Sequence, residues 1–291
     1  MERNHLRRSR WSTSVAGRFA HLENMPCRKI IRKPENYLLG LANIMNRVTL
    51  LPTLPRQTAA LKRFEQTNVE LNRFYWTFKC SLDHILPYMA NVATVPELIM
   101  GSSGERLNIS SDQFVNEAPQ TERVARHSLL VLAVTSFEDY IKEVLTTFLI
   151  RNWKPDKTYK VRFRPQDLPA SSDMEDWLRD KAIQTVVDDH LSRNYDGRFE
   201  AISKLLSECG AQRPSLHKSM QDLAAHACEA RNCIVHSSAI IDARTARSLA
   251  RLIPGIAQGN ALEIDEELLW KFLGALRDSA RSLDVEIRKL L

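Results

Sequence analysis

Three polar residues near position 230 have side chains and a spacing that suit chemistry on a phosphate. Arg231 and Asn232 are adjacent, and His236 follows the arginine by five positions. A histidine can take or give a proton near neutral pH, so it can move the proton of an RNA 2′-hydroxyl. An arginine can make two parallel hydrogen bonds to phosphate oxygens and so stabilise a phosphorane. These residue types therefore favour cleavage of RNA by attack of its own 2′-hydroxyl group.

The three residues fall in a helix that we expect from about Ser215 to Ser237. On a helix that turns about 100° per residue, the apolar positions close to Ile234 define the face that packs on the core. The apolar residues within roughly 40° of Ile234 are Leu223, Ala227 and Ala230.

Asn232 and His236 lie nearly opposite the core face and Arg231 lies at its border, so the core does not cover the polar trio. Asn232 and His236 are an i, i+4 pair, so the amide can orient the imidazole. Arg231 and His236 are about 140° apart on an ideal helix, so one copy of the motif does not close on a phosphate. A second copy, or a loosened helix end at Ser237, would be needed.

The bare pattern is weak evidence for chemistry. An isolated arginine and histidine on a helix are more often surface residues or residues that interact with the helix dipole. No other arginine of the chain stands five, six or seven residues before a histidine, so the pattern has no internal competitor. Its specificity has to come from the surrounding sequence.

Around this motif the chain resembles the HEPN superfamily (higher eukaryotes and prokaryotes nucleotide-binding), in particular its bacterial defence and toxin-like ribonucleases. Residues 231–236 match their R-x4-6-H signature, with the polar residue that the family favours directly after the arginine. Residues 237–242 look like the segment that commonly follows. Upstream, Leu129–Leu145 resembles the long early helix of the family, with an acidic and aromatic centre at 136–140. The resemblance covers roughly residues 121–291.

The resemblance implies an all-α domain that dimerises, so that two copies of the motif form one composite cleft. It implies cutting of RNA without a metal ion or cofactor, with products that carry a 2′,3′-cyclic phosphate and a 5′-hydroxyl. By the same resemblance, His236 is the acid or base, Arg231 the cation for the phosphate or transition state, and Asn232 the orienting neighbour. An acidic residue of the early helix, Glu138 or Asp139, is expected to approach the arginine.

We therefore expect a metal-independent endoribonuclease of the defence (abortive infection) or toxin type, with RNA as its substrate. The expected protein partners are a second copy of the chain and an antitoxin or another component of a defence system. The main alternative is a HEPN-like helical scaffold that binds RNA, a nucleotide or a partner protein without cutting. Such a scaffold would not require Arg231 or His236. A third alternative is one half of a toxin–antitoxin pair that a nucleotidyltransferase partner silences.

Periodic apolar residues elsewhere predict helices and hardly any strands, hence an all-α, HEPN-like helical bundle with about six to eight helices. The expected helices span about 55–88, 119–151, 172–191, 198–208 and 215–237, followed by two that begin at Asp242 and Asp265. The first is amphipathic, through Leu61, Phe64, Leu71, Phe74, Phe78, Leu82 and Ile85. The second has an expected inward stripe that includes Leu129, Ala133, Phe137, Tyr140 or Ile141, Val144 and Phe148. Ser172 and Glu175 have the spacing of a capping box, and the two aspartates are suited to capping the helices that follow them.

Basic residues gather near the N-terminus. Residues 1–63 contain 13 Lys and Arg against 3 Asp and Glu, which leaves 28 against 32 for the remainder. We expect a basic, partly disordered leader at 1–54, an additional, accessory N-terminal helical region at 55–115 and a HEPN-like helical domain at 116–291.

The basic leader has more than one interpretation. It can hold RNA through phosphate contacts, or it can be a solvated arm without a partner. Translation can also begin at Met25 or Met45 instead of Met1.

The composition is that of a globular chain, with 44% hydrophobic and 26% charged residues. No apolar stretch approaches the ~20 residues that cross a bilayer, and no apolar segment of a secretory signal follows the N-terminal arginines. Five cysteines without a C-x-x-C pair indicate reduced thiols. We therefore expect a cytoplasmic protein that does not associate with a membrane.

Two other clusters of residues suggest zinc binding and base stacking, but both fit ordinary structural roles better. His226, Cys228, Cys233 and His236 point in different directions around one helix, so they cannot converge on a tetrahedral zinc ion. The aromatic residues between positions 74 and 78 lie beside Arg73 and Lys79 and could stack on bases. A core role is favoured for that cluster, because its phenylalanines fit the apolar stripe of the helix.

Overall fold

The computed structural model describes residues 57–153, 161, 163–164, 168, 174–192, 195–210 and 218–290. The chain divides into two units, Met1–Pro55 and Arg56–Leu291, and every described residue belongs to the second. The expected leader at 1–54 and Ser172 of the expected capping box lie outside the described residues.

The described part of the chain is all-α, as the sequence predicts. Its helices are α3 (Ala59–Met89), α4 (Val95–Leu98), α5 (Ser102–Arg106), α6 (Ser111–Arg151), α7 (Met174–Ser192), α8 (Tyr195–Glu208), α9 (Lys218–His236), α10 (Ala243–Leu249) and α11 (Glu266–Arg288). These residues form no β-strand, and their β-type contacts are two isolated bridges, Thr94 with Ser110 and Ile240 with Ala261.

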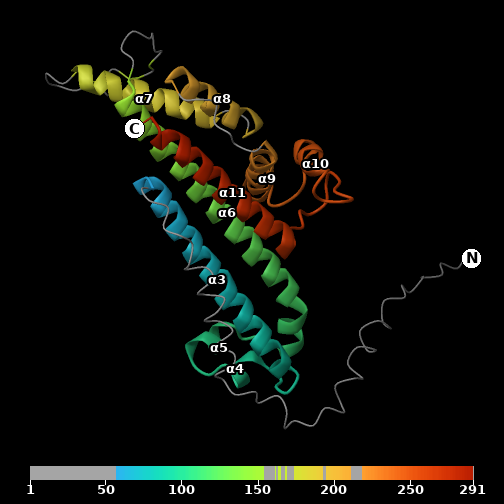
Figure 1. The fold of residues 1–291 in the computed structure, drawn as a ribbon. Coiled ribbons are helices and arrows are strands. Elements are labelled where there is room, and N and C mark those ends of the chain that lie inside the picture. Colours follow the sequence, from blue (N-terminus) through green and yellow to red (C-terminus); the bar gives the residue numbers. More distant parts are fainter. Residues whose placement is uncertain are drawn as a thin grey trace, which may run out of the picture. The chain divides into compact units, whose positions relative to one another are not determined.

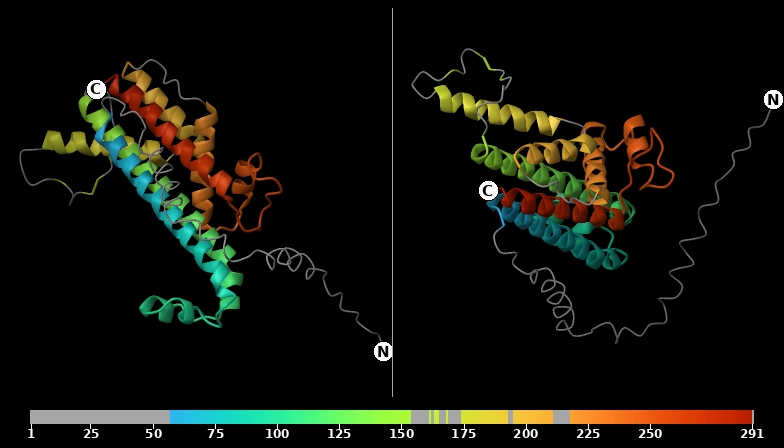
Figure 2. Two further views of the ribbon diagram at one scale, coloured as in Figure 1. Left: turned by 60° about the horizontal axis from the view of Figure 1, so that its bottom comes forward. Right: turned by 45° about the horizontal axis from the view of Figure 1, so that its top comes forward.

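Three long helices, α3, α6 and α11, lie side by side in all views (Figures 1 and 2). An ion pair between Lys79 and Glu122, at 2.7 Å, joins α3 to α6. Tyr140 of α6 donates a hydrogen bond of 2.8 Å to the carbonyl of Ala280 in α11. Helix α6 also contacts α7 and α9, so it is the element from which the other long helices take their positions.

The inward stripe expected for α6 is confirmed. Its members are all at most 2% exposed: Leu129, Ala133, Phe137, Tyr140, Ile141, Val144 and Phe148. The helix begins earlier than the sequence predicts, because the hydroxyl of Ser110 accepts a hydrogen bond from the amide of Gln113 and caps it. Pro119, the expected start, lies inside the helix on an exposed turn. The expected boundary between 115 and 116 also falls within continuous α6.

The two predicted aspartate caps are confirmed. Asp242 accepts a hydrogen bond of 2.7 Å from the amide of Thr245 at the start of α10, and Asp265 accepts one of 2.7 Å from Leu268 at the start of α11. Each carboxylate satisfies an amide that has no partner within its helix. These caps mark the residues at which α10 and α11 begin.

The core face expected for α3 was wrong at its centre. Tyr75 is buried at 1% exposure, whereas Phe74 is 56% exposed. The reason lies in α11, because the Tyr75 ring packs against Trp270 with centroids 5.6 Å apart and its hydroxyl reaches Glu266 at 3.2 Å. Trp76 stacks on the same indole at 5.7 Å. Contact with α11 therefore places the buried face of α3 at Tyr75 instead of at Phe74.

No helix among the described residues combines the length and the apolar character needed to cross a membrane. The longest of them, α6, carries charged residues throughout its length.

The hydrogen bond from Tyr140 is a testable contribution to the contact between α6 and α11. Tyr140→Phe should lower the free energy of unfolding by about 1 kcal/mol, because it removes a buried hydrogen bond and leaves the ring in place. Urea unfolding followed by circular dichroism measures this loss. Tyr88→Phe is the control, since Tyr88 is 50% exposed. Equal losses in the two variants would contradict this role.

His127 of α6 should give the fold a dependence on pH. Burial lowers the pKa of its imidazole from the usual 6.5, and Arg123 acts in the same direction, against Glu263 and a hydrogen bond to the backbone of Leu262. Since folding favours the neutral imidazole, stability is complete above about pH 6.5 and falls as the pH drops towards the folded-state pKa. The free energy of unfolding of His127→Gln should fall less than that of the wild type between about pH 6.5 and 5. Parallel curves for the two proteins would refute this.

Candidate functional site

Arg231 of the sequence motif contacts Glu138 of the early helix. The Nη2 atom of Arg231, in α9, donates to Oε2 of Glu138, in α6, at 2.5 Å. The two residues are 93 positions apart in the chain. Of the two acidic residues considered for this place, Asp139 is instead exposed to solvent.

Small side chains on α9 allow this contact. Its buried residues include four alanines, Ala224, Ala225, Ala227 and Ala230. Helices that meet through small side chains can approach closely, so the backbone of α9 lies near that of its neighbours. The core face predicted around Ile234 is confirmed in part, because Ala227 and Ala230 are fully buried whereas Leu223 and Ile234 are partly buried against the core. Burial extends around the helix to Ala225 and Cys228, so the prediction that the core leaves the polar trio uncovered is wrong for Arg231, whose side chain is 17% exposed. Arg231, at the border of that face, therefore reaches α6.

Helix α8 adds two further donors to the Glu138 carboxylate. The hydroxyl of Tyr195 donates to Oε1 at 3.0 Å, and Nη1 of Arg198 donates to the same oxygen at 3.1 Å. Arg198 is itself held in place, because its Nη2 donates to the carbonyl of Leu191 near the end of α7 and its guanidinium lies 4.2 Å from the Tyr195 ring centre. One carboxylate thus joins α6, α8 and α9.

Asn232 belongs to the same network. Its Oδ1 accepts a hydrogen bond of 2.9 Å from Nη1 of Arg231 and lies 3.4 Å from the hydroxyl of Tyr195. The amide oxygen therefore orients Arg231. The sequence predicts that the Asn232 amide orients the imidazole of His236. In the structure, the hydrogen bonds of the amide oxygen are instead with Arg231 and Tyr195.

The network has a surplus positive charge and is largely shielded from solvent. Two guanidinium groups face one carboxylate, and the side chains are exposed by 7% for Arg198, 17% for Arg231 and 23% for Glu138. The Nε atoms of both arginines are buried without a hydrogen-bond partner among the described residues. Because two guanidinium groups share one carboxylate, the charge of the network favours an incoming anion.

Burial keeps the neighbouring acidic protons in place. Burial is the main cause that raises the pKa of Tyr195, and the nearby Cys228 thiol and Glu138 carboxylate raise it further. Burial likewise raises the pKa of Cys228, and Glu138 adds to the effect. The phenol therefore stays a hydrogen-bond donor to Glu138 at neutral pH, and the thiol is not a nucleophile.

His236 is the last residue of α9 and is exposed. Among the described residues it has no hydrogen bond or ion pair, so a single chain does not bring it to Arg231. Two residues after it, Ser238 begins a turn in which Ser238 and Ala239 adopt φ values of 52° and 61°. These values lie in the left-handed region, which costs non-glycine residues roughly 1 kcal/mol or more. Hydrogen bonds hold this turn, from the amide of Ala239 to Cys233 and from Leu262 to Ala239. The helix therefore ends in a fixed, strained turn instead of a loosened one.

Arg231, Asn232 and Glu138 are thus brought together, and His236 and Asp139 are not. Sequence reasoning missed Tyr195 and Arg198. Their i, i+3 spacing places both on one face of a helix, which is a readable sign of a paired aromatic and cation. Nothing in the sequence indicated that this face would meet Glu138.

The described residues contain no group of three or more His, Cys, Asp or Glu side chains that could hold a metal ion. In particular, the side chains of Cys228 and Cys233 are buried, whereas that of His236 is exposed. These residues of α9 therefore do not form one ligand set.

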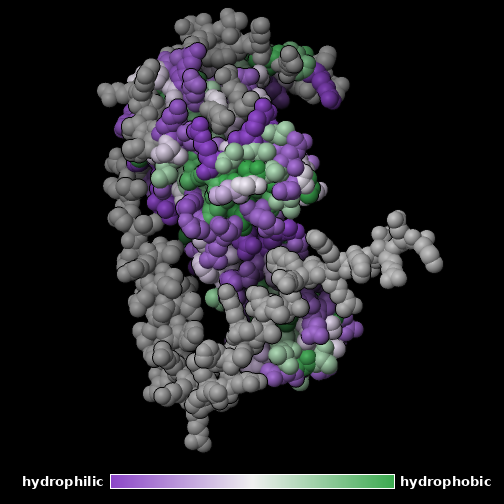
Figure 3. Space-filling view, turned by 90° about the vertical axis from the view of Figure 1, so that its right-hand side faces the viewer, coloured by the Kyte–Doolittle hydropathy of each residue, from purple (hydrophilic) through white to green (hydrophobic). Residues whose placement is uncertain are grey.

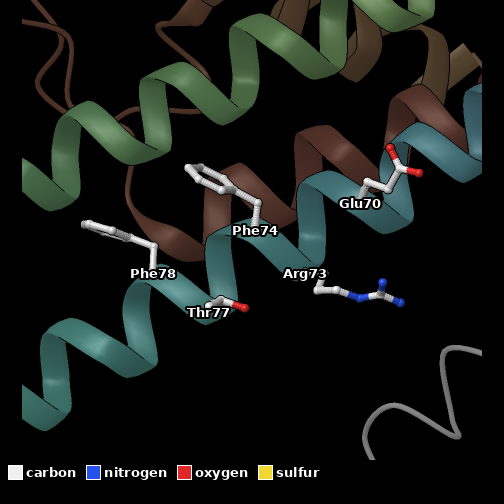
Figure 4. Close-up of a pocket in the computed structure, with 5 residues that line it drawn as sticks. All are labelled: Glu70, Arg73, Phe74, Thr77 and Phe78. Atoms are coloured by element: carbon white, nitrogen blue, oxygen red, sulfur yellow. The ribbon is translucent and has the colours of Figure 1, made fainter.

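A second candidate site is a depression of about 420 Å³ on α3. Phe74 and Phe78 project on one side of it and Arg73 on another, with Glu70 further along the helix (Figure 4). Base stacking requires a positively charged track beside the rings, and here one arginine is offset by one glutamate. The neighbouring Lys79 is engaged by Asp83 and Glu122. The network around Glu138 is the stronger candidate.

Comparison of the chain with known protein families, with curated proteins and with solved structures found no match.

The two adjacent acidic residues of α6 offer a matched test of this network. Glu138→Gln should lower the free energy of unfolding by about 1–3 kcal/mol, because two largely buried guanidinium groups lose their anion. Asp139→Asn should change it by less than about 0.5 kcal/mol, as is usual for exposed positions. Chemical unfolding of the two variants beside the wild type measures the difference, and a greater loss for Asp139→Asn would be incompatible with the network.

Proposed function

We propose that this protein is a metal-independent endoribonuclease of the HEPN type, acting in the cytoplasm in defence or as a toxin. Its substrate is RNA, and its active form is a homodimer. Arg231 is the cation that meets the phosphate, His236 is the acid or base, and Asn232 orients the arginine. Glu138 is a supporting residue that pairs with Arg231 while no phosphate is bound. An antitoxin or another defence-system protein is the expected regulatory partner.

The contact between Arg231 and Glu138 carries the proposal. The resemblance to HEPN ribonucleases implies that an acidic residue of the early helix approaches the motif arginine. In this chain the two are joined at 2.5 Å. A chance surface arginine would have no reason to meet that helix at that position, so the contact supports the motif as a functional unit.

The proposed reaction needs no metal ion. His236 takes the proton of the 2′-hydroxyl while the 2′-oxygen attacks the adjacent phosphorus. Arg231 stabilises the additional negative charge on the phosphoryl oxygens. The bond from phosphorus to the 5′-oxygen then breaks, and a protonated histidine gives its proton to that oxygen. The products are a 2′,3′-cyclic phosphate and a 5′-hydroxyl, so all atoms and protons are accounted for.

A second copy of the chain closes the gap between Arg231 and His236 in this proposal. The two side chains leave α9 on different sides, so two chains that meet at their motifs can supply a cation and two histidines to one phosphate. Val235 and Ile240, close to His236 in the chain, are exposed by 50% and 47%. An apolar patch ringed by hydrophilic residues lies on the side of the molecule that carries α9 and α10 (Figure 3). Exposed apolar surface of this kind supports a protein contact.

One observation favours the alternative, a HEPN-like scaffold that binds RNA, a nucleotide or a partner protein without cutting. Arg231 is engaged by Glu138 and Asn232, and among the described residues no contact links it to His236. A scaffold in which Arg231 has a structural role would look the same within one chain. The proposed enzyme and this scaffold differ in whether removal of His236 abolishes cutting.

Cleavage of total RNA in the presence of EDTA tests the proposal. Wild-type protein should cut, and His236→Ala and Arg231→Ala should each reduce the rate by at least about 100-fold. His84→Ala and Arg277→Ala are matched controls, because both residues lie on the surface of other helices. The product ends should be cyclic phosphate and 5′-hydroxyl.

Two results would refute the proposed ribonuclease activity. The first is cutting that EDTA abolishes, since the proposed reaction uses no metal. The second is a folded, dimeric wild type that binds RNA but leaves it intact, with both active-site variants binding equally well, which is the behaviour of the scaffold.

A further inference from the structure

We propose that Arg198 of α8, which belongs to no sequence motif, is a positioning residue that makes Arg231 available to a substrate phosphate. This inference rests on the proposed function and concerns the same site. The inference concerns a competition between Arg198 and Arg231, whose guanidinium groups share the single carboxylate of Glu138.

The sharing is visible in the contacts. Arg198 donates to Oε1 of Glu138 and Arg231 donates to Oε2. Tyr195 donates to the same oxygen as Arg198, so the α8 side of the carboxylate is satisfied without Arg231. Counting charges, the three ionised groups leave the site with one surplus positive charge.

Arg198 is fixed and Arg231 is not held as firmly. Arg198 is exposed by only 7%, donates to the carbonyl of Leu191 and lies over the Tyr195 ring. Arg231 is more exposed, at 17%, and its second contact is to a neutral amide, that of Asn232. When an anion arrives, Arg231 is therefore the guanidinium that can turn towards it.

Arg198 lowers the cost of that exchange. If Glu138 had Arg231 as its sole cation, a phosphate that took Arg231 would leave the largely buried carboxylate unpaired, which is costly in a protein interior. With Arg198 and Tyr195 still bound to Oε1, the carboxylate keeps a cation and a donor. Arg198 also adds a positive charge near the phosphate. Its removal should weaken phosphate binding although it does not touch RNA.

Binding of RNA that cannot be cut tests this directly. A mixed-sequence pool of fully 2′-O-methylated oligoribonucleotides lacks the attacking hydroxyl, and fluorescence anisotropy gives its affinity for the full chain. Arg231→Ala and Arg198→Gln should each weaken binding about tenfold, as expected for the loss of one charge-assisted contact. The slope of affinity against salt should fall by about one phosphate contact in both. Arg198→Lys keeps the charge but loses the fork of the guanidinium and its stacking on Tyr195, so it should bind more tightly than Arg198→Gln and more weakly than the wild type.

The double variant separates competition from simple structural support. Glu138→Gln combined with Arg198→Gln removes the competing anion together with its second cation, so Arg231 is released and affinity should return to within about threefold of the wild type. Glu138→Gln alone should bind at least as tightly as the wild type. A merely structural role predicts the reverse, with each added substitution weakening binding. Circular dichroism and thermal melting show whether each variant folds. If Arg198→Gln does not fold, the double variant still tests the proposal, because it buries no unpaired carboxylate.

The outcomes distinguish this inference from the function on which it rests. If Arg231→Ala weakens binding but Arg198→Gln does not, or the double variant binds no better than Arg198→Gln, the positioning role is wrong and the proposed function stands. If Arg231→Ala binds like the wild type and the wild type cuts no RNA, the proposed function itself is wrong and Arg198 loses its role with it.

Discussion

The carboxylate of Glu138 is the point at which three separate parts of the chain are tied together. It accepts hydrogen bonds from Arg231 in α9 and from Arg198 and Tyr195 in α8, while its own helix, α6, forms the centre of the apolar core. A largely buried charge is stable only with a partner, so the positions of α8 and α9 depend on each other through this group. The ion pairs of the network and the apolar packing of the core therefore both hold α8 and α9 in place relative to α6.

Packing is what makes the network geometrically feasible. Helix α6 fills the core with large side chains such as Phe137, whereas the buried part of α9 is rich in alanine. Interaxial distances range over about 8–10 Å according to the size of the side chains at the contact. Larger residues at Ala227 and Ala230 would move α9 outward and take Arg231 away from Glu138. The small residues of α9 are therefore as important for the site as the charged ones.

Within one chain, the structure separates Arg231 and His236, the two groups of the proposed active site. The arginine is drawn inward, where a low-water environment strengthens its interaction with an anion. The histidine is presented at the end of α9, ahead of a turn in which Ser238 and Ala239 hold left-handed conformations. Strain of this kind persists only where neighbouring contacts impose it, and such positions are common at functional sites. A second chain that meets the first at this end would place proton transfer and phosphate binding in one cleft.

Local sequence patterns were enough to predict the helical fold class, the aspartate caps of α10 and α11, the buried stripe of α6 and part of the core face of α9. These features follow from local periodicity and from groups a few residues apart, which a single chain segment specifies. The resemblance to HEPN ribonucleases, in turn, reduced the expected acidic partner of Arg231 to Glu138 or Asp139. Tertiary contacts selected Glu138, buried Tyr75 instead of Phe74, and added Arg198 and Tyr195 to the network. Each of these depends on the rotation of one helix against another, which is set by contacts between residues far apart in the chain.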